Sequence, residues 1–270
     1  MKIGIMISVL DDIEKSIRSA CDMGIHSCQL ITFDPGQYTD ERAEQIQSAL
    51  SANDMTVSTF WAGWTGPRIW NFTEGPVTLG LLPPAYRYKR VCDLKKGSDF
   101  AKKLGINQIA THAGFMPENP HDPLYAGMID ALREVALYCK ANGQRFLFET
   151  GQETPVALLR AFEDIGTDNL GVNFDTGNLI LYGKANPVDA LDMIGPYVRD
   201  LHIKDALYPT TGLSLGKEMP VGDGKANFPA IVARLKELGY DGALTIEREI
   251  TGEQQTKDIL RAKALLESLL

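Results

Sequence analysis

The chain has 270 residues, of which 44% are hydrophobic, and it carries a formal net charge of −8 with a pI near 5.1. This length suits either two ordinary domains or one α/β barrel. The acidic balance, without any dense run of lysine and arginine, argues against nucleic acid or an anionic membrane as the habitual partner.

No apolar run approaches the length of a membrane span. The apolar start at 3–10 leads directly into Asp11 and Asp12, which does not fit a secretion signal. The four cysteines are scattered without CxxC spacing, which indicates reduced thiols. We therefore expect a soluble cytoplasmic protein.

Eight strand-like runs alternate with amphipathic segments. The runs lie near 2–8, 27–33, 56–62, 107–112, 145–150, 170–175, 198–204 and 242–248. The segments between them stop at glycine or asparagine, residues that suit the left-handed position at a helix end. These stops are Gly24, Asn53, Gly105, Gly143, Gly166, Gly195 and Gly239. With the terminal segment to Leu270, they predict eight helices.

Several helix starts are also legible. Thr154-Pro155 and Asn186-Pro187 each pair a capping side chain with a proline at the first helical position, and Asn227-Phe228-Pro229 has a similar pattern. Strands separated by helices imply parallel pairing with right-handed crossovers. Eight such units predict one (β/α)₈ TIM barrel domain over residues 1–270. A doubly wound open sheet is the main alternative.

Two connections are long, from Gly63 to about Tyr86 and from Ala206 to Lys225. Loops of this length in a compact domain are usually functional lids or disordered. Both follow strand C-termini, the face on which barrel enzymes place their sites. The second contains Gly222-x-Gly224, which invites a phosphate-binding interpretation, although two glycines before a helix are more often a simple turn.

Four strand-like runs in the second half of the chain end in acidic or imidazole side chains. These residues are Glu149, Asp175, His202 and Glu247. Because parallel neighbours end at the same side of a barrel, the four side chains should converge there. Two glutamates, an aspartate and a histidine form a plausible shell for one divalent ion.

Each of these residues also has an ordinary structural interpretation. A glutamate at a strand end is most often solvated or paired with a lysine, and Lys204 is available for that pairing. Alternation along a strand places His202 and Lys204 on one face, and likewise Thr245, Glu247 and Glu249. Burial of an unpaired carboxylate is costly. The recurrence in four consecutive units therefore favours a metal site.

Other aromatic and imidazole residues follow the strands of the first half. His112 ends the fourth run and either contacts substrate or holds the adjacent loop. Trp61, Trp64 and Trp70 either wall a sugar pocket or pack in the core or lid. His26 and His121 are interpreted as structural or loop residues.

The four strand-end motifs resemble the xylose isomerase-like barrel superfamily, and within it the sugar phosphate isomerase/epimerase group. The resemblance spans nearly the whole chain and rests on Phe148-Glu149-Thr150, Asp175-Thr176-Gly177-Asn178, Leu201-His202-Ile203-Lys204-Asp205, and Gly239-Tyr240-Asp241-Gly242 with Ile246-Glu247. It implies one divalent ion (Mn²⁺, Mg²⁺, Co²⁺ or Zn²⁺) held by Glu149, Asp175, His202 and Glu247. It also implies that the two glutamates act as the acid/base pair on opposite faces of the substrate.

Asn178 stands where ketose epimerases of this family carry a histidine, which speaks against epimerisation of a free ketose. Lys204 resembles members that act as inosose dehydratases or on keto-sugars. The substrate-binding candidates are His112, Asn178, Lys204, Trp61 and Glu153.

The resemblance leads to a metal-dependent isomerase or epimerase acting on a small sugar or keto-polyol through an enediolate. The alternative is a dehydratase that uses the same enolate and expels a β-hydroxyl. A non-catalytic sugar-binding barrel is a third interpretation. An apurinic endonuclease would need a histidine-rich three-zinc cluster, and four histidines cannot supply it. A homodimer or homotetramer is the oligomer that the family implies.

Overall fold

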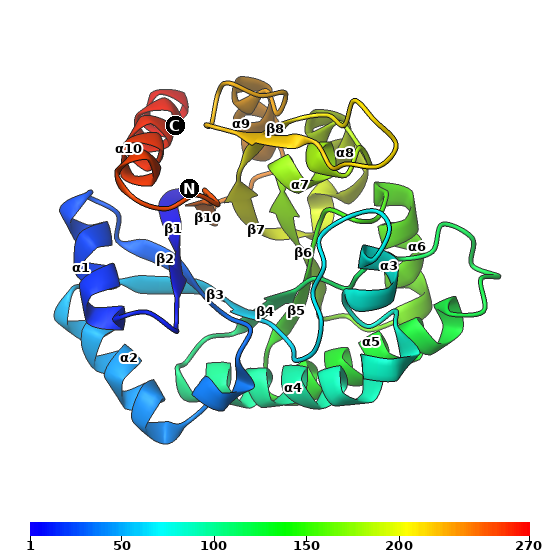
Figure 1. Cartoon of the computed structure of the whole chain (residues 1–270). Coiled ribbons are helices and arrows are strands. Elements are labelled where there is room, and N and C mark those ends of the chain that lie inside the picture. Colours follow the sequence, from blue (N-terminus) through cyan, green and yellow to red (C-terminus); the bar gives the residue numbers. More distant parts are fainter.

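The computed structural model describes residues 1–270, and eight parallel strands close into a barrel surrounded by helices (Figure 1). Around the barrel the strands follow the order β1-β10-β7-β6-β5-β4-β3-β2. Their bounds are β1 Lys2–Ser8, β2 Ser27–Thr32, β3 Thr56–Ala62, β4 Gln108–Thr111, β5 Arg145–Glu149, β6 Leu170–Asp175, β7 Val198–Ile203 and β10 Ala243–Ile246. The predicted (β/α)₈ barrel is confirmed, and the open doubly wound sheet is excluded because β1 pairs with β10.

Eight helices follow the eight barrel strands, as predicted. They are α1 Ile13–Asp22, α2 Asp40–Ala52, α4 Pro84–Lys103, α5 Tyr125–Ala141, α6 Pro155–Ile165, α8 Pro187–Ile194, α9 Phe228–Glu237 and α10 Glu253–Leu269. Short additional elements lie in the connections: the 3₁₀ turns Pro35–Gln37 and Gly195–Tyr197, the helices α3 Gly75–Thr78 and α7 Thr176–Leu181, and an antiparallel pair of strands, β8 Asp205–Leu207 and β9 Lys217–Met219. None of the helices is both long enough and apolar enough to cross a lipid bilayer.

The helices end at all seven predicted positions. Five of the stops, Gly24, Gly105, Gly143, Gly166 and Gly239, have the expected positive φ. Gly195 and Asn53 do not: Gly195 has a φ of −49° and continues into the 3₁₀ turn, and Asp54 takes the left-handed conformation next to Asn53.

All three predicted helix starts are confirmed, and two of them have the expected side-chain cap. The side chains of Thr154 and Asn186 accept hydrogen bonds from backbone N–H groups of α6 and α8. Asn227 differs, because its backbone is left-handed (φ 59°) and its side chain makes no capping bond.

The main core lies between the barrel strands and the surrounding helices, where 67 buried residues form one apolar cluster. The apolar cluster inside the barrel is much smaller and contains the buried residues Trp61, Ala110 and Leu147. Polar side chains fill much of the barrel interior. Gln29 on β2 donates to Asn173 on β6 (3.0 Å), and Thr59 on β3 donates to Asp200 on β7 (2.6 Å). These bonds cross the barrel, so the floor of any site at the strand ends is a buried hydrogen-bonded network.

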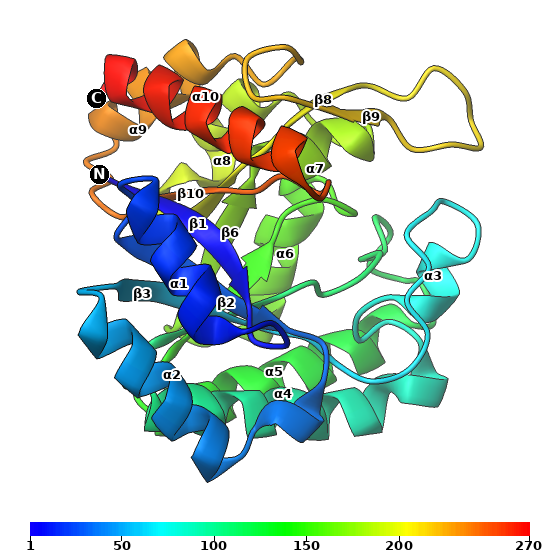
Figure 2. The same ribbon diagram turned by 60° about the vertical axis from the view of Figure 1, so that its left-hand side comes forward.

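Each long connection is held by one buried charged side chain. Arg90 on α4 is fully buried, donates to the carbonyl oxygens of Thr65, Pro67 and Gly80, and covers the ring of Trp64 at 3.9 Å. Trp64 is therefore a core residue. Figure 2 shows the α3 segment and the β8–β9 hairpin extending from the same side of the barrel, away from both chain ends.

The second connection depends on Asp205. Its carboxylate accepts hydrogen bonds from the backbone N–H groups of Gly222 and Gly224 (both 2.9 Å) and of Ala226 (3.0 Å). A Cβ atom at Gly224 would collide with this carboxylate, so only glycine allows so close an approach. The glycine pair is thus a turn that holds the hairpin, and its N–H groups are not free for phosphate.

Candidate metal centre and its cavity

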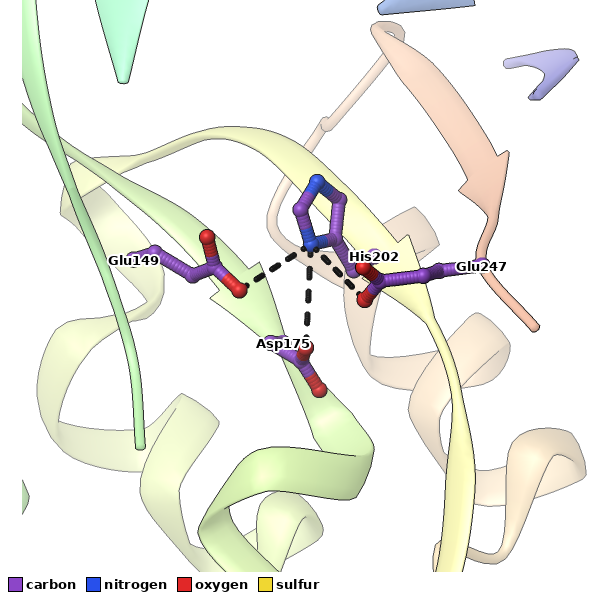
Figure 3. Close-up of side chains that lie close together, drawn as sticks. All are labelled: Glu149, Asp175, His202 and Glu247. Atoms are coloured by element: carbon purple, nitrogen blue, oxygen red, sulfur yellow. Dashed lines mark hydrogen bonds and ion pairs between the residues drawn. The ribbon is translucent and has the colours of Figure 1, made fainter. Parts of the chain in front are cut away.

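Four side chains from consecutive barrel strands meet at the carboxyl ends of those strands (Figure 3). His202 Nδ1 lies 3.2 Å from Glu149 Oε1, 3.2 Å from Glu247 Oε2 and 3.6 Å from Asp175 Oδ2. The strand register explains this convergence, because Asp175 pairs with His202, and His202 with Thr245, two residues before Glu247. The ligand atoms of the four residues predicted to bind the metal therefore lie close together at one place.

Asp175 divides its two carboxylate oxygens between structure and site. Oδ1 caps α7 by accepting from the backbone N–H of Asn178 at 2.7 Å. Oδ2 is buried and has no hydrogen-bond partner. Burial raises the pKa of Asp175 to about 7, although Lys204 opposes the shift. An unpartnered buried carboxylate oxygen is costly, and a cation at this point would relieve it.

Glu149 belongs to the cluster and also contacts three neighbouring side chains outside it. Trp61 Nε1 donates to Oε2, Asn178 Nδ2 donates to Oε1 at 3.1 Å, and His112 Nε2 lies 3.3 Å from Oε1. Burial alone would raise the pKa of Glu149, but His112 and His202 outweigh it and hold the pKa below its ordinary value. Glu149 is therefore ionised and held in one orientation.

Lys204 supplies a buried positive charge beside the cluster. Its Nζ lies 2.6 Å from Glu249 Oε1, 3.3 Å from Glu247 Oε2 and 3.9 Å from Asp175 Oδ2. Burial would lower its pKa, but the three carboxylates raise it well above the ordinary value. The pKa of Glu247, despite burial, lies well below its ordinary range because of Lys204 and His202. The lysine pairing considered for Glu247 is thus present within the cluster.

The donor set fits one divalent ion. The ligand atoms lie within 4.8 Å of one another, slightly more than the roughly 4.2 Å across an ion with ligands at about 2.1 Å, so a small contraction would close the shell. Carboxylate oxygens with one imidazole suit Mg²⁺, Mn²⁺ and related ions. The unpartnered Oδ2 of Asp175 supports the same assignment.

A cavity of about 290 Å³ opens beside this cluster. Part of the lining is apolar and aromatic. The imidazole and carboxylate groups in the lining are His112 after β4, Glu149 on β5, and Glu247 and Glu249 after β10. The lining residues are Ile31, Phe33, Trp61, Trp70, His112, Glu149, Gln152, Asn178, Leu181, Tyr182, Leu215, Glu247 and Glu249.

The cavity brings together most of the predicted substrate-binding residues. Trp61, His112 and Asn178 line it, and Lys204 reaches it through Glu247 and Glu249. Glu153 is buried but does not line it, and burial raises its pKa to about 8.

His26 and His121 are exposed and lie outside the cavity lining. Of the tryptophans considered for the wall, Trp70 contributes to it and Trp64 does not.

Sequence reasoning missed Phe33, Gln152 and Tyr182. Phe33 directly follows β2, so its place after a strand end was a usable signal. Gln152 follows Glu149 by three residues in a connection that had no pattern of its own. Tyr182 ends α7, a helix too short to be seen in the sequence. Residues on such connections are placed only by packing.

The fold is a (β/α)₈ barrel with a cluster at its strand ends that could bind a metal ion, and comparison with known proteins assigns its family. The family model described as xylose isomerase-like TIM barrel matches residues 17–269. A xylose isomerase domain protein from Planctomyces limnophilus has a solved structure with 36% identity and a TM-score of 0.93, covering 99% of this chain and 96% of that one. The chain belongs to the xylose isomerase-like TIM barrel family.

Curated relatives are more distant and are matched over part of their length. An uncharacterized protein of Methanocaldococcus jannaschii, MJ1311, is 28% identical over 67% of this chain and 66% of its own length. Inosose dehydratase of Geobacillus kaustophilus is 26% identical over 47% of this chain and 46% of its own length. A D-psicose 3-epimerase shares the fold, with a TM-score of 0.74 at 16% identity over 100% of this chain and 99% of that chain.

Proposed function

We propose that this protein is a divalent-metal-dependent isomerase or epimerase that acts on a small sugar or keto-polyol through an enediolate. One observation carries the proposal. Glu149 and Glu247 approach His202 Nδ1 from two sides, each at 3.2 Å, and both line the cavity (Figure 3). Two ionised carboxylates therefore stand on either side of the proposed ion position and at the edge of the cavity that would hold the substrate.

The residues of this chain divide the chemistry between them. Glu149, Asp175, His202 and Glu247 would hold the ion, which when bound polarises a carbonyl and its neighbouring hydroxyl. One glutamate takes the proton from the carbon between them as general base. The other returns a proton to the opposite face or to the adjacent carbon. Trp61 and Asn178 each donate to one carboxylate oxygen of Glu149 and so fix its orientation beside the cavity.

A dehydratase is the second candidate, and Lys204 is the observation that favours it. Its side chain is buried and protonated, and its Nζ pairs with Glu247 and Glu249, both of which line the cavity. An ammonium there can stabilise an enolate oxygen or assist the departure of a β-hydroxyl as water. The similarity to an inosose dehydratase supports this candidate, and the shared fold of a D-psicose 3-epimerase supports the first.

The experiment combines metal loading with substitution of each glutamate. Protein stripped with a chelator and reloaded with Mn²⁺ or Mg²⁺ would be incubated with keto-sugars and inososes in D₂O. NMR would detect solvent deuterium at carbon with no change in composition for an isomerase or epimerase. A new enone absorbance with loss of water would identify the dehydratase.

Glu149→Gln and Glu247→Gln should each lower turnover by a factor on the order of 10² to 10⁴, the usual range for a general acid or base. Glu44→Gln, at an exposed position on α2, is the matched control and should retain activity. Turnover that survives in both site variants would show that the acid/base assignment is wrong. Retained sugar binding without turnover in the wild type would identify a binding protein.

A further inference from the structure

The first inference concerns the charge that the cavity accepts, and it rests on the proposed function. No lysine or arginine lines the cavity, and its carboxylates are Glu149, Glu247 and Glu249. The buried Lys204 is already engaged by Glu247 and Glu249. A phosphate or carboxylate on the substrate would therefore meet these carboxylates, and no lysine or arginine side chain would be free to pair with it.

Gln152 supplies an unoccupied polar contact in the same cavity. Its side chain is 1% exposed and lines the cavity, yet neither Oε1 nor Nε2 has a hydrogen-bond partner. A buried primary amide without partners is costly. Because it offers one acceptor and two donors, its natural complement is a pair of neighbouring hydroxyl groups.

The aromatic part of the cavity wall can pack against the apolar C–H face of a sugar ring. Phe33, Trp61 and Trp70 line it, with the Phe33 and Trp61 ring centroids 4.8 Å apart and Trp70 packed against His112 at 5.0 Å. Arg68 covers the ring of Phe33 at 4.2 Å but does not itself line the cavity.

We propose that the cavity selects an uncharged polyhydroxylated carbonyl compound, without phosphate or carboxylate, and that Gln152 binds two of its neighbouring hydroxyls. The reason for this selection is that the three carboxylates of the metal cluster would already neutralise the ion, and no lysine or arginine is free for an anionic group. The aromatic wall then covers the apolar face of the ring or chain. The volume of about 290 Å³ restricts the substrate to roughly one monosaccharide or cyclitol unit.

The test compares matched neutral and anionic compounds on the metal-loaded protein. Calorimetry and turnover would be measured with a keto-hexose, its 6-phosphate, an inosose and a keto-sugar acid. The neutral compounds should bind at least 10-fold more tightly than their anionic counterparts. Tighter binding of the phosphate or the acid would overturn the inference.

Two variants sharpen the result. Gln152→Leu should raise KM for neutral substrates about 3- to 10-fold, the worth of a neutral hydrogen bond, with little change in kcat. An unchanged KM would show that Gln152 does not bind the substrate.

Arg68→Gln should leave the preference for neutral over anionic compounds unaltered. Selective loss of anion binding in this variant would identify Arg68 as the residue that binds the anion and would overturn the inference. Turnover of an anionic substrate would defeat this inference and leave the proposed function intact, because that function is tested by the two glutamates.

A second inference, independent of the substrate, concerns how His202 is oriented. Its Nδ1 faces the three carboxylates, whereas its Nε2 faces the barrel interior, 2.9 Å from Gln29 Oε1. Gln29 is fully buried and its own Nε2 donates to Asn173 Oδ1 at 3.0 Å. This bond leaves the oxygen of Gln29 facing the imidazole. When Nδ1 uses its lone pair to hold the ion, Nε2 must carry the ring proton, and Gln29 Oε1 is the acceptor for it.

We infer that Gln29 is a positioning residue that fixes the tautomer and ring plane of His202 for metal binding. Outer partners of this kind typically change metal affinity 10- to 100-fold when removed. Asn173 contributes by accepting from the amide of Gln29. Its own Nδ2 lies 3.1 Å from His202 Nε2 and, being a donor, makes no hydrogen bond to that nitrogen in this tautomer.

Metal affinity of the full chain, measured by calorimetry with Mn²⁺, tests this inference apart from activity. Gln29→Leu should weaken binding about 10- to 100-fold, and Gln29→Glu, which keeps the acceptor, should restore most of it. Nitrogen-15 NMR of the Mg²⁺-loaded protein should show His202 protonated at Nε2 and not at Nδ1. An affinity for Gln29→Leu within twofold of the wild type, or an Nε2 without a proton, would overturn the role. Should Gln29→Leu fail to fold, the NMR result on the wild type still decides.

Discussion

The two halves of the barrel treat their strand ends differently. Strands β5, β6, β7 and β10 end at or beside Glu149, Asp175, His202 and Glu247, whereas β2 and β3 end beside aromatic residues, Phe33 and Trp61. The carboxylates gathered in one half share Lys204 as a cation and His202 as a close neighbour. Aromatic rings in the other half lower the local dielectric, which strengthens those interactions. In the proposed function, the charged half carries out the chemistry and the aromatic half binds the substrate.

The largest expected effect comes from removing a ligand in the charged half. Asp175→Asn keeps an oxygen available to cap α7 but lowers the negative charge of the site. We expect Mn²⁺ affinity to fall by more than about 100-fold, beyond the usual effect of an outer partner, as measured by calorimetry. Asp189→Asn, exposed in the first turn of α8, is the control. Equal affinity in the two variants would contradict the metal assignment.

The stability of the connection in the aromatic half should depend on the buried side chain of Arg90. Arg90→Met leaves the carbonyl oxygens of Thr65, Pro67 and Gly80 without their donor. We expect the free energy of unfolding to fall by about 3 kcal/mol, measured by urea denaturation. Arg160→Met on α6, which donates to a single carbonyl, should cost about 1 kcal/mol or less. Similar losses at both positions would show that Arg90 does not have this special role.

Glu153 tests what happens to a carboxyl in the charged half that lacks a cation. Its pKa is raised to about 8 by burial, so the folded state keeps the proton while the unfolded state loses it above about pH 4.5. Stability that is complete below pH 4.5 is therefore lost as the pH rises toward 8. Relative to Glu153→Gln, the wild type should lose about 2 kcal/mol between pH 5 and pH 8, within the limit of about 1.4 kcal/mol per pH unit. Parallel pH profiles from thermal unfolding would disprove this account.

The smallest effect is expected at the rim of the aromatic wall. Trp70 is 38% exposed and packs against His112. Trp70→Ala should raise KM about 3- to 10-fold, in line with about 1 kcal/mol for an aromatic contact, and leave kcat and metal affinity nearly unchanged. A large fall in kcat would mean that Trp70 also positions the charged half, and the two halves would then not be separable.

Much of the fold could be predicted because its signals are local. The five glycines with positive φ mark helix ends without reference to any distant contact, and apolar runs mark the strands between them. Gly195 and Asn227 departed from the pattern because their backbone conformations are set by neighbours, a 3₁₀ turn in one case and the turn held by Asp205 in the other. The β8–β9 hairpin was missed because each strand has only three residues.

The sequence by itself determined the alternation of strands and helices, and placed Glu149, Asp175, His202 and Glu247 on one side of their strands, because side-chain direction alternates along a strand. Only the tertiary structure decided that Trp64 belongs to the core, that Gln152 faces the cavity, and that Gln29 meets His202 from across the barrel. Those contacts join residues as far as 173 positions apart. Their geometry follows from how the closed barrel packs, which no local pattern of residues encodes.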